Sequence, residues 1–204
     1  LSFASWHAML HNFTIEQAGF GWFETGLTQT VREIPGFLAF TAIVWIMLFR
    51  EQTVAYVSLI LMGAGIALTG YFPSLAGVLL TTMIMSIGFH YFEAVSQSMQ
   101  LQLLPKVAAP RIMGQVASWG AAAQLLAYGA LAIVWWSGFR TYTVMYAAVG
   151  LVSVLLLLAA WTFFSRFDGP VPQRKSIVVR RRYWLYYALQ FMAGARRQIF
   201  IAFA

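Results

Sequence analysis

The chain has 204 residues, of which 61% are hydrophobic, 17% aromatic and only 9% charged. Soluble domains carry about 25% charged residues, so nineteen Lys, Arg, Asp and Glu side chains are too few to solvate a soluble chain of this length. The composition indicates a membrane protein and excludes a disordered or collagen-like chain. The absence of Cys excludes disulfide scaffolds, thiol catalysis and thiolate metal sites.

The formal net charge of +7 is a property that nucleic-acid-binding proteins share. Here, however, the basic residues fall between long apolar runs rather than along one solvated face. That pattern is typical of membrane topology. We therefore expect the lipid bilayer, and no nucleic acid, as a partner.

Several apolar runs have the length of a membrane span. A bilayer core of about 30 Å needs roughly 20 apolar residues of helix, and Pro, Gly and charged clusters delimit such runs. Five complete runs cover approximately residues 25–49, 53–71, 75–104, 112–136 and 142–164. A sixth run begins near Tyr183. Residues 1–21 are interpreted as the end of an earlier helix followed by a loop. We predict an all-α, polytopic membrane helical bundle. Because the sequence starts and stops inside such segments, we also expect a piece of a longer protein.

The distribution of Lys and Arg predicts how the spans are oriented. If the long polar segment at 166–182 is cytoplasmic, alternation puts nine basic residues on the cytoplasmic side and only Arg140 outside, in agreement with the positive-inside rule. The same segment is the natural linker between two bundles. We predict an N-terminal transmembrane bundle at 1–165, a cytoplasmic linker at 166–182 and the start of a second, truncated transmembrane bundle at 183–204.

The span at 25–49 carries Arg32 and Glu33 in its outer half. Adjacent residues on a helix point about 100° apart, so we expect different partners for them: an anionic group or Glu93 for Arg32, and a cation for Glu33. Pro35 removes a backbone hydrogen bond and is expected to kink this helix, which is one way to shape a cavity. An ordinary membrane proline is the alternative.

A stripe of polar side chains follows the span at 75–104. Its members, spaced by four, three, four and three residues, share an arc of about 80° at helical periodicity and are Ser86, His90, Glu93, Gln97 and Gln100. A carboxylate near the bilayer centre costs several kcal/mol unless it faces water, is paired or is protonated. We therefore predict a water-accessible cavity. A polar seam that joins helices through hydrogen bonds of about 1 kcal/mol each is the alternative.

Within this stripe, His90 and Glu93 are the predicted substrate or proton site, because a His and a partly buried carboxylate can both titrate near neutral pH. Gln97 and Gln100 would supply hydrogen-bonding groups of the cavity wall. Two ligand residues without further His or any Cys make a poor metal site. We therefore expect no metal and no cofactor.

Two later spans differ in the surfaces they offer. The span at 142–164 is rich in Val, Leu and Ala and has no ionisable group, so we expect it to face lipid. The span at 112–136 offers small-residue surfaces for close helix contact, formed by Gly114, Gly120, Gly129, Ala121, Ala122 and Ala123.

In the last run, Arg196 and Arg197 lie about 20 Å from the inner membrane surface. At that depth neither reaches the headgroups easily. One of them should pair with Glu33 or Glu93, or line water. A purely structural pairing is the alternative.

Four strings carry a resemblance to a known family. They are REIPGFLAF at 32–40, GFHYFE at 88–93, QSMQLQ at 97–102 and GARRQIF at 194–200. They resemble a bacterial branch of the major facilitator superfamily of transporters, and the similarity covers nearly the whole chain. The resemblance implies two six-helix bundles, of which this chain would hold the end of helix 1, helices 2 to 6, the central linker and the start of helix 7.

In that family helices 1, 4, 7 and 10 line the central cavity, so the resemblance places both the polar stripe and the paired arginines at the transport path. The sequence departs from the family in two places. The Gly, Asp and Arg rich loop between helices 2 and 3 is reduced to Arg50, Glu51 and Gln52, which puts the usual gating contacts in doubt. The fifth helix lacks the Gly-Pro signature of antiporters, so drug efflux is not predicted.

Residues and resemblance together predict a secondary active transporter of a small solute, working by alternating access and coupled to protons, in the bacterial cytoplasmic membrane. No covalent chemistry is implied, so no enzyme is predicted. Two alternatives stay open: a membrane scaffold or receptor on a transporter-like fold, and a membrane enzyme, for which the residues form no recognisable constellation. The predicted site consists of His90, Glu93, Gln97, Gln100, Arg32, Glu33, Arg196 and Arg197.

Overall fold

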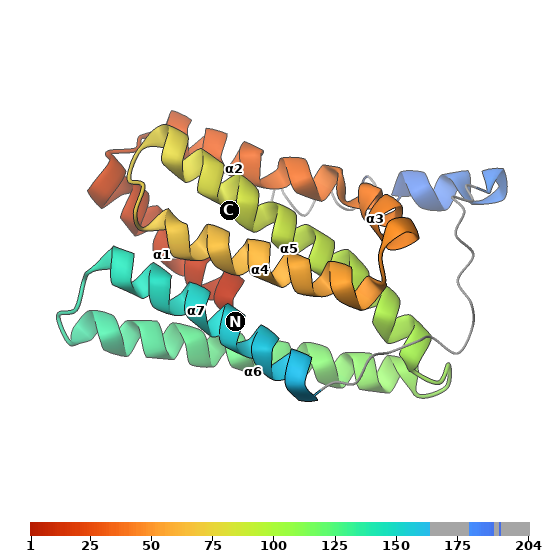
Figure 1. The fold of residues 1–204 in the computed structure, drawn as a ribbon. Coiled ribbons are helices and arrows are strands. Elements are labelled where there is room, and N and C mark those ends of the chain that lie inside the picture. Colours follow the sequence, from red (N-terminus) through yellow and green to blue (C-terminus); the bar gives the residue numbers. More distant parts are fainter. Residues whose placement is uncertain (164–179, 190–191, 193–204) are drawn as a thin grey trace. The chain divides into compact units, whose positions relative to one another are not determined.

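Every element in the described part of the chain, residues 1–163, 180–189 and 192 of a computed structural model, is helical (Figure 1). The elements are α1 (Ser2–Ala18), α2 (Trp22–Phe37), η1 (Ala39–Thr41), α3 (Ala42–Leu48), α4 (Glu51–Thr69), α5 (Leu75–Leu103), α6 (Ala109–Trp136), α7 (Tyr142–Phe163) and η2 (Arg181–Tyr183). Five segments are long and apolar enough to cross a membrane: Trp22–Leu48, which joins α2, η1 and α3, and the helices α4 to α7. The prediction of an all-helical, multi-pass membrane protein is confirmed in the helical content and in the length and composition of these segments.

The chain divides into two compact units, residues 1–173 and 174–204. Residues 164–179, which include most of the predicted linker at 166–182, lie outside the described residues. In the second unit the structure describes η2 and the helical residues 184–189 and 192. The predicted division into two bundles and a linker stays a prediction.

Local sequence sets where the helices begin and end. α1 ends at Gly19, whose φ of 65° a residue without a side chain adopts readily. α5 begins at Ser74, whose hydroxyl accepts a hydrogen bond from the Gly77 N–H at 3.2 Å. Pro35 lies near the end of α2, after which the span continues as η1 and α3. The span is therefore interrupted two residues after Pro35, and a kink at Pro35 itself stays a prediction.

α4 lies between α5 and α7 and makes the most extensive helix contacts of the bundle (Figure 1). A Cβ at Gly65 of α4 would fall under 3.0 Å from the backbone of Met85, and a Cβ at Gly88 of α5 would meet the backbone of Met62 as closely. On the other side of α4, Gly63 packs against Ser153 of α7. Because small residues let helix backbones approach each other, the glycines of α4 and α5 make the close packing of α4 against α5 and α7 possible.

The small-residue surface predicted on α6 is not used in this way within the described part of the chain. Only Ala109 and Ala127 of α6 are buried, and Trp119 and Trp136 are 77% and 89% exposed. Nothing lies within 4 Å of a Cβ placed at any of the three predicted glycines, Gly114, Gly120 and Gly129. Helical periodicity shows which residues share a face, but it does not show which helix covers that face.

α7 has one packed face and one uncovered face. Tyr146 is fully buried, and Gly150 lies against the backbone of α4. Leu151 and Leu155 on the other face are more than half exposed. The expectation that this span faces lipid is therefore wrong for the packed face and stays a prediction for the uncovered one, since the absence of ionisable residues permits both environments.

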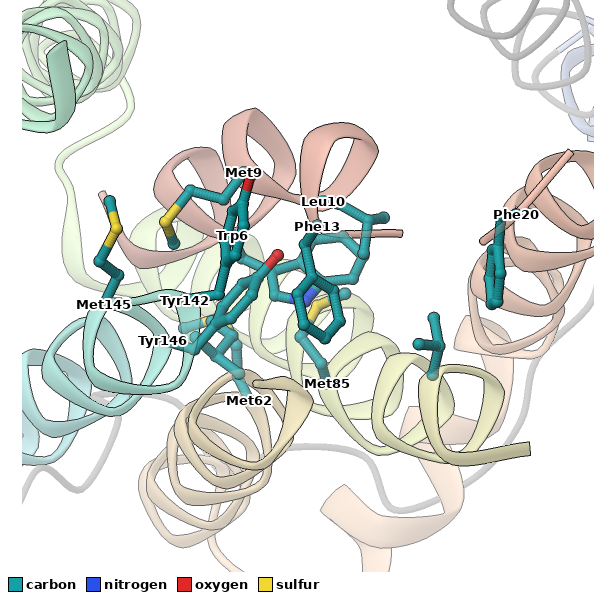
Figure 2. Packing of buried hydrophobic residues seen from close by; sticks show 12 residues of the cluster. Trp6, Met9, Leu10, Phe13, Phe20, Met62, Met85, Tyr142, Met145 and Tyr146 are labelled. Carbon is teal, nitrogen blue, oxygen red and sulfur yellow. The ribbon is translucent and has the colours of Figure 1, made fainter. Parts of the chain in front are cut away.

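The core of the first unit lies between α1, α4, α5 and α7 (Figure 2). Trp6 of α1 is fully buried, and its Nε1–H donates to the Thr69 hydroxyl at 3.1 Å. The Phe13 ring meets Tyr142 and Tyr146 of α7 edge-on, with ring centroids 5.5 Å and 5.3 Å away. α1 is thus a full member of the bundle, which the sequence reading of residues 1–21 as a helix end and a loop underestimated.

Candidate functional site

The polar stripe of α5 faces α2 at its buried end. The Ser86 hydroxyl donates a hydrogen bond to the backbone carbonyl of Arg32. One turn further along both helices the His90 ring lies against Gly36, where a Cβ would be 2.8 Å from Cε1. The two helices therefore run side by side with matched positions (Figure 1), and the absence of a side chain at Gly36 makes room for the imidazole.

Arg32 and Glu33 bind each other. The Arg32 Nε and NH2 groups both lie 2.8 Å from Oε1 of Glu33. The Arg32 side chain is only 7% exposed and that of Glu33 28% exposed. The prediction of separate partners is wrong because both side chains are long enough to bend toward each other around the helix, and a buried guanidinium needs the nearest carboxylate.

His90 is half-buried at the centre of a group of charges. The carboxylates of Glu33 and Glu93 and the guanidinium of Arg32 lie within electrostatic range of its ring. The ring also contacts Phe89 edge-on, with centroids 5.1 Å apart. The structure therefore brings together four of the predicted site residues: Arg32, Glu33, His90 and Glu93.

His7 of α1 joins this group, although the sequence analysis did not select it. Its half-buried ring lies within electrostatic range of Arg32. It stacks with Phe3 at 6.0 Å, and Phe3 stacks in turn on Phe89 at 4.1 Å. The sequence gives no signal that separates His7 from His11 on the same helix. We call His7, Arg32, Glu33, His90 and Glu93 the ionisable cluster.

Two buried polar atoms, on the stretches of α2 and α5 that precede the ionisable cluster, have no hydrogen-bond partner in the described part of the chain. They are Oε1 of Gln29 on α2 and the Thr82 hydroxyl on α5. Buried polar atoms are normally hydrogen-bonded to protein or ordered water. Buried polar groups in α2 and α5 are therefore not confined to the ionisable side chains.

The remaining predicted site residues are not brought into the cluster. Gln97 is exposed and Gln100 partly buried, and no described residue hydrogen-bonds to either side chain. Glu93 is partly buried, and its carboxylate has no hydrogen bond or ion pair with any described residue. Arg196 and Arg197 lie outside the described residues.

A second polar network ties the start of α4 to the end of α5, on another face of α5. Oε1 of Glu51 accepts hydrogen bonds from the Ser98 hydroxyl at 2.9 Å and from Nε2 of Gln102 at 3.0 Å. The hydroxyls of Thr41 and Tyr91 form a further hydrogen bond to α5. The sequence places Glu51 in a predicted loop between two spans, and a polar residue at a helix start carries no signal of its tertiary partner.

The described residues contain no group of three or more His, Asp or Glu side chains that could hold a metal ion. They also offer no nucleophile beside a base in the ionisable cluster. The fold and the cluster define a helical multi-pass membrane protein with charged groups between its spans. Comparison of the chain with protein-family models, with curated proteins and with solved structures finds no match.

The buried ion pair is the strongest electrostatic feature of the cluster, so breaking it should be costly. Glu33→Gln is expected to lower the free energy of unfolding by about 3 kcal/mol, because Arg32 then stays buried without a countercharge. Removing both charges, with Arg32→Met and Glu33→Gln together, should recover most of that loss. Thermal unfolding of the four proteins of this double-mutant cycle in detergent measures the coupling. Additive losses would contradict the pairing.

Proposed function

We propose that the chain is part of a secondary active transporter that moves a small solute across the membrane by alternating access. The observation that carries the proposal is the ionisable cluster, which places a buried ion pair, two His rings and a further carboxylate between helices of membrane-spanning length. Charged groups inside a membrane are costly and typically mark substrate or proton pathways. The resemblance of four sequence strings to the major facilitator superfamily gives independent support.

In this proposal His90 and Glu93 form the substrate or proton site. Glu93 takes up and releases the proton, and the rings of His90 and His7 together with Arg32 and Glu33 set the charge around it. Gln97 and Gln100 supply hydrogen-bonding groups of the cavity wall, and Arg196 and Arg197 act as charge partners or anion binders. Binding and protonation are coupled because both occur among charges that act on one another.

The membrane in this proposal is the bacterial cytoplasmic membrane. What supports it is the resemblance to a bacterial branch of the superfamily, while the excess of Lys and Arg around 166–182 over the single Arg140 on the opposite side supports the orientation. The connections α1 to α2, α4 to α5 and α6 to α7 lie at the same end of the first unit (Figure 1), and this orientation would put that end outside.

A flux assay on the full-length protein tests the function. Purified protein in liposomes should accumulate a solute from a screened set of metabolites when a pH gradient is imposed, and should stop when the gradient is collapsed. Chemical turnover of a solute without any gradient would favour an enzyme. Neither flux nor turnover, with a folded protein, would favour a scaffold or receptor.

Gly36 offers a mild perturbation of the same site. Gly36→Ala places a Cβ against the His90 ring, 2.8 Å from Cε1, so the ring must turn away at a cost of about 1 kcal/mol. We expect gradient-driven uptake to fall several-fold while the protein stays folded. The matched control is Gly26→Ala on the same helix, where a Cβ meets nothing within 4 Å. Equal uptake by both variants would show that the position of His90 does not matter.

A further inference from the structure

A pocket of about 340 Å³ lies at the end of the bundle where α1 ends and α7 begins. Its polar wall comes from Gln17 of α1 and from Arg140 and Thr141, which precede α7. Its apolar wall comes from Tyr71 and Pro73 in the connection between α4 and α5. The volume falls within the range of small-ligand pockets, and the mixed wall suits a ligand with a polar group. None of these residues belongs to the ionisable cluster.

A cation and an anion flank this pocket. The Arg140 guanidinium lies over the Trp135 ring, 5.0 Å from its centroid, and it forms no ion pair with a described carboxylate. Oε2 of Glu16 accepts a hydrogen bond of 2.9 Å from the hydroxyl of Tyr142, which itself lines the pocket. Both charges lie within electrostatic range of that hydroxyl. Arg140 therefore lines the pocket, and Glu16 lies just behind it, hydrogen-bonded to the lining residue Tyr142, so a cation and an anion lie close to the same space without a direct ion pair.

We propose that this pocket binds a zwitterion in which a phosphate group is joined to an amine, as in ethanolamine phosphate. The planar fork of Arg140 matches phosphate oxygens, and the Thr141 hydroxyl and the Gln17 amide supply further donors. Glu16 attracts the ammonium group and disfavours a ligand that carries only negative charge. Because the pocket lies where membrane-spanning helices end, the ligand is either the headgroup of a phospholipid or the free zwitterion.

Native mass spectrometry of the full chain with added phospholipids tests this proposal. The wild-type protein should retain phosphatidylethanolamine about tenfold more strongly than phosphatidylglycerol, which corresponds to one favourable charge interaction. Arg140→Gln should weaken the binding of both lipids about tenfold, and Arg140→Lys should retain part of it. Glu16→Gln should weaken phosphatidylethanolamine binding alone, since the amide can still accept the Tyr142 hydrogen bond.

Lys106→Gln is the matched control, because Lys106 is exposed in the connection between α5 and α6 and does not line the pocket. It should leave lipid binding unchanged. Free ethanolamine phosphate that displaces the lipid at equal concentration would identify the soluble zwitterion as the ligand, and failure to displace it would identify the lipid; both support the chemistry of the site. Unchanged binding by Arg140→Gln, or a wild-type preference for phosphatidylglycerol, would overturn the proposal.

Discussion

Glu93→Gln is expected to abolish uptake driven by a pH gradient while leaving the protein folded. The amide has nearly the same size as the carboxyl group but cannot carry a proton. Glu93 has no hydrogen bond or ion pair with a described residue, so the substitution removes charge without breaking a structural contact. Glu93, Glu33 and Arg32 all lie within electrostatic range of the His90 ring. Uptake into liposomes and thermal unfolding of the same preparation measure the two parts of this prediction.

Glu24→Gln supplies the control for that experiment. It makes the same chemical change in the first turn of α2, where Glu24 accepts a hydrogen bond from the Gly21 N–H at 2.9 Å, away from the ionisable cluster. Its uptake should equal that of the wild type. If Glu93→Gln transports as well as Glu24→Gln under a pH gradient, Glu93 has no role in coupling. If it retains solute exchange without a gradient, Glu93 carries the proton rather than the solute.

The helices themselves could be predicted closely from sequence. The expected span at 75–104 is observed as Leu75–Leu103, and that at 142–164 as Tyr142–Phe163. The length of an apolar run and the Pro, Gly and charged residues that delimit it are local properties, so they can be read directly from the sequence. Periodicity also predicted correctly that Ser86 and His90 share one face of a helix, and the structure turns that face toward α2.

The partners of those faces could not be predicted, because periodicity is a property of one helix and contact is a property of two. His7 joins the ionisable cluster only because α1 lies within reach of α2 and α5. Arg32 and Glu33 were assigned to different partners from their angular separation, whereas flexible side chains and burial decide the pairing. For the same reason, glycines look alike in sequence whether they face a backbone, as Gly88 does, or open space, as Gly120 does.

α5 joins the scaffold to the site through two of its faces. Gly88 presses against α4, and His90, two residues later and roughly 200° around the helix, faces α2. α4 therefore fixes the height and rotation at which α5 presents the ionisable cluster. A change at Gly88 should act on the bundle first and on the cluster through it.

Gly88→Ala is accordingly expected to destabilise the bundle strongly, lowering the free energy of unfolding by about 3 kcal/mol. The added Cβ would fall under 3.0 Å from the Met62 backbone and would also meet the backbone carbonyl of Ser58, and neither group can turn away as a side chain can. Gly120→Ala is the control: nothing lies within 4 Å of its Cβ, and Ala in a helix interior is more stable than Gly by up to about 1 kcal/mol. Thermal unfolding in detergent should therefore move the two variants in opposite directions. Equal stabilities would mean that α4 and α5 are not in backbone contact. The Gly88 contact could then not be what fixes the rotation of α5 that places His90 against α2.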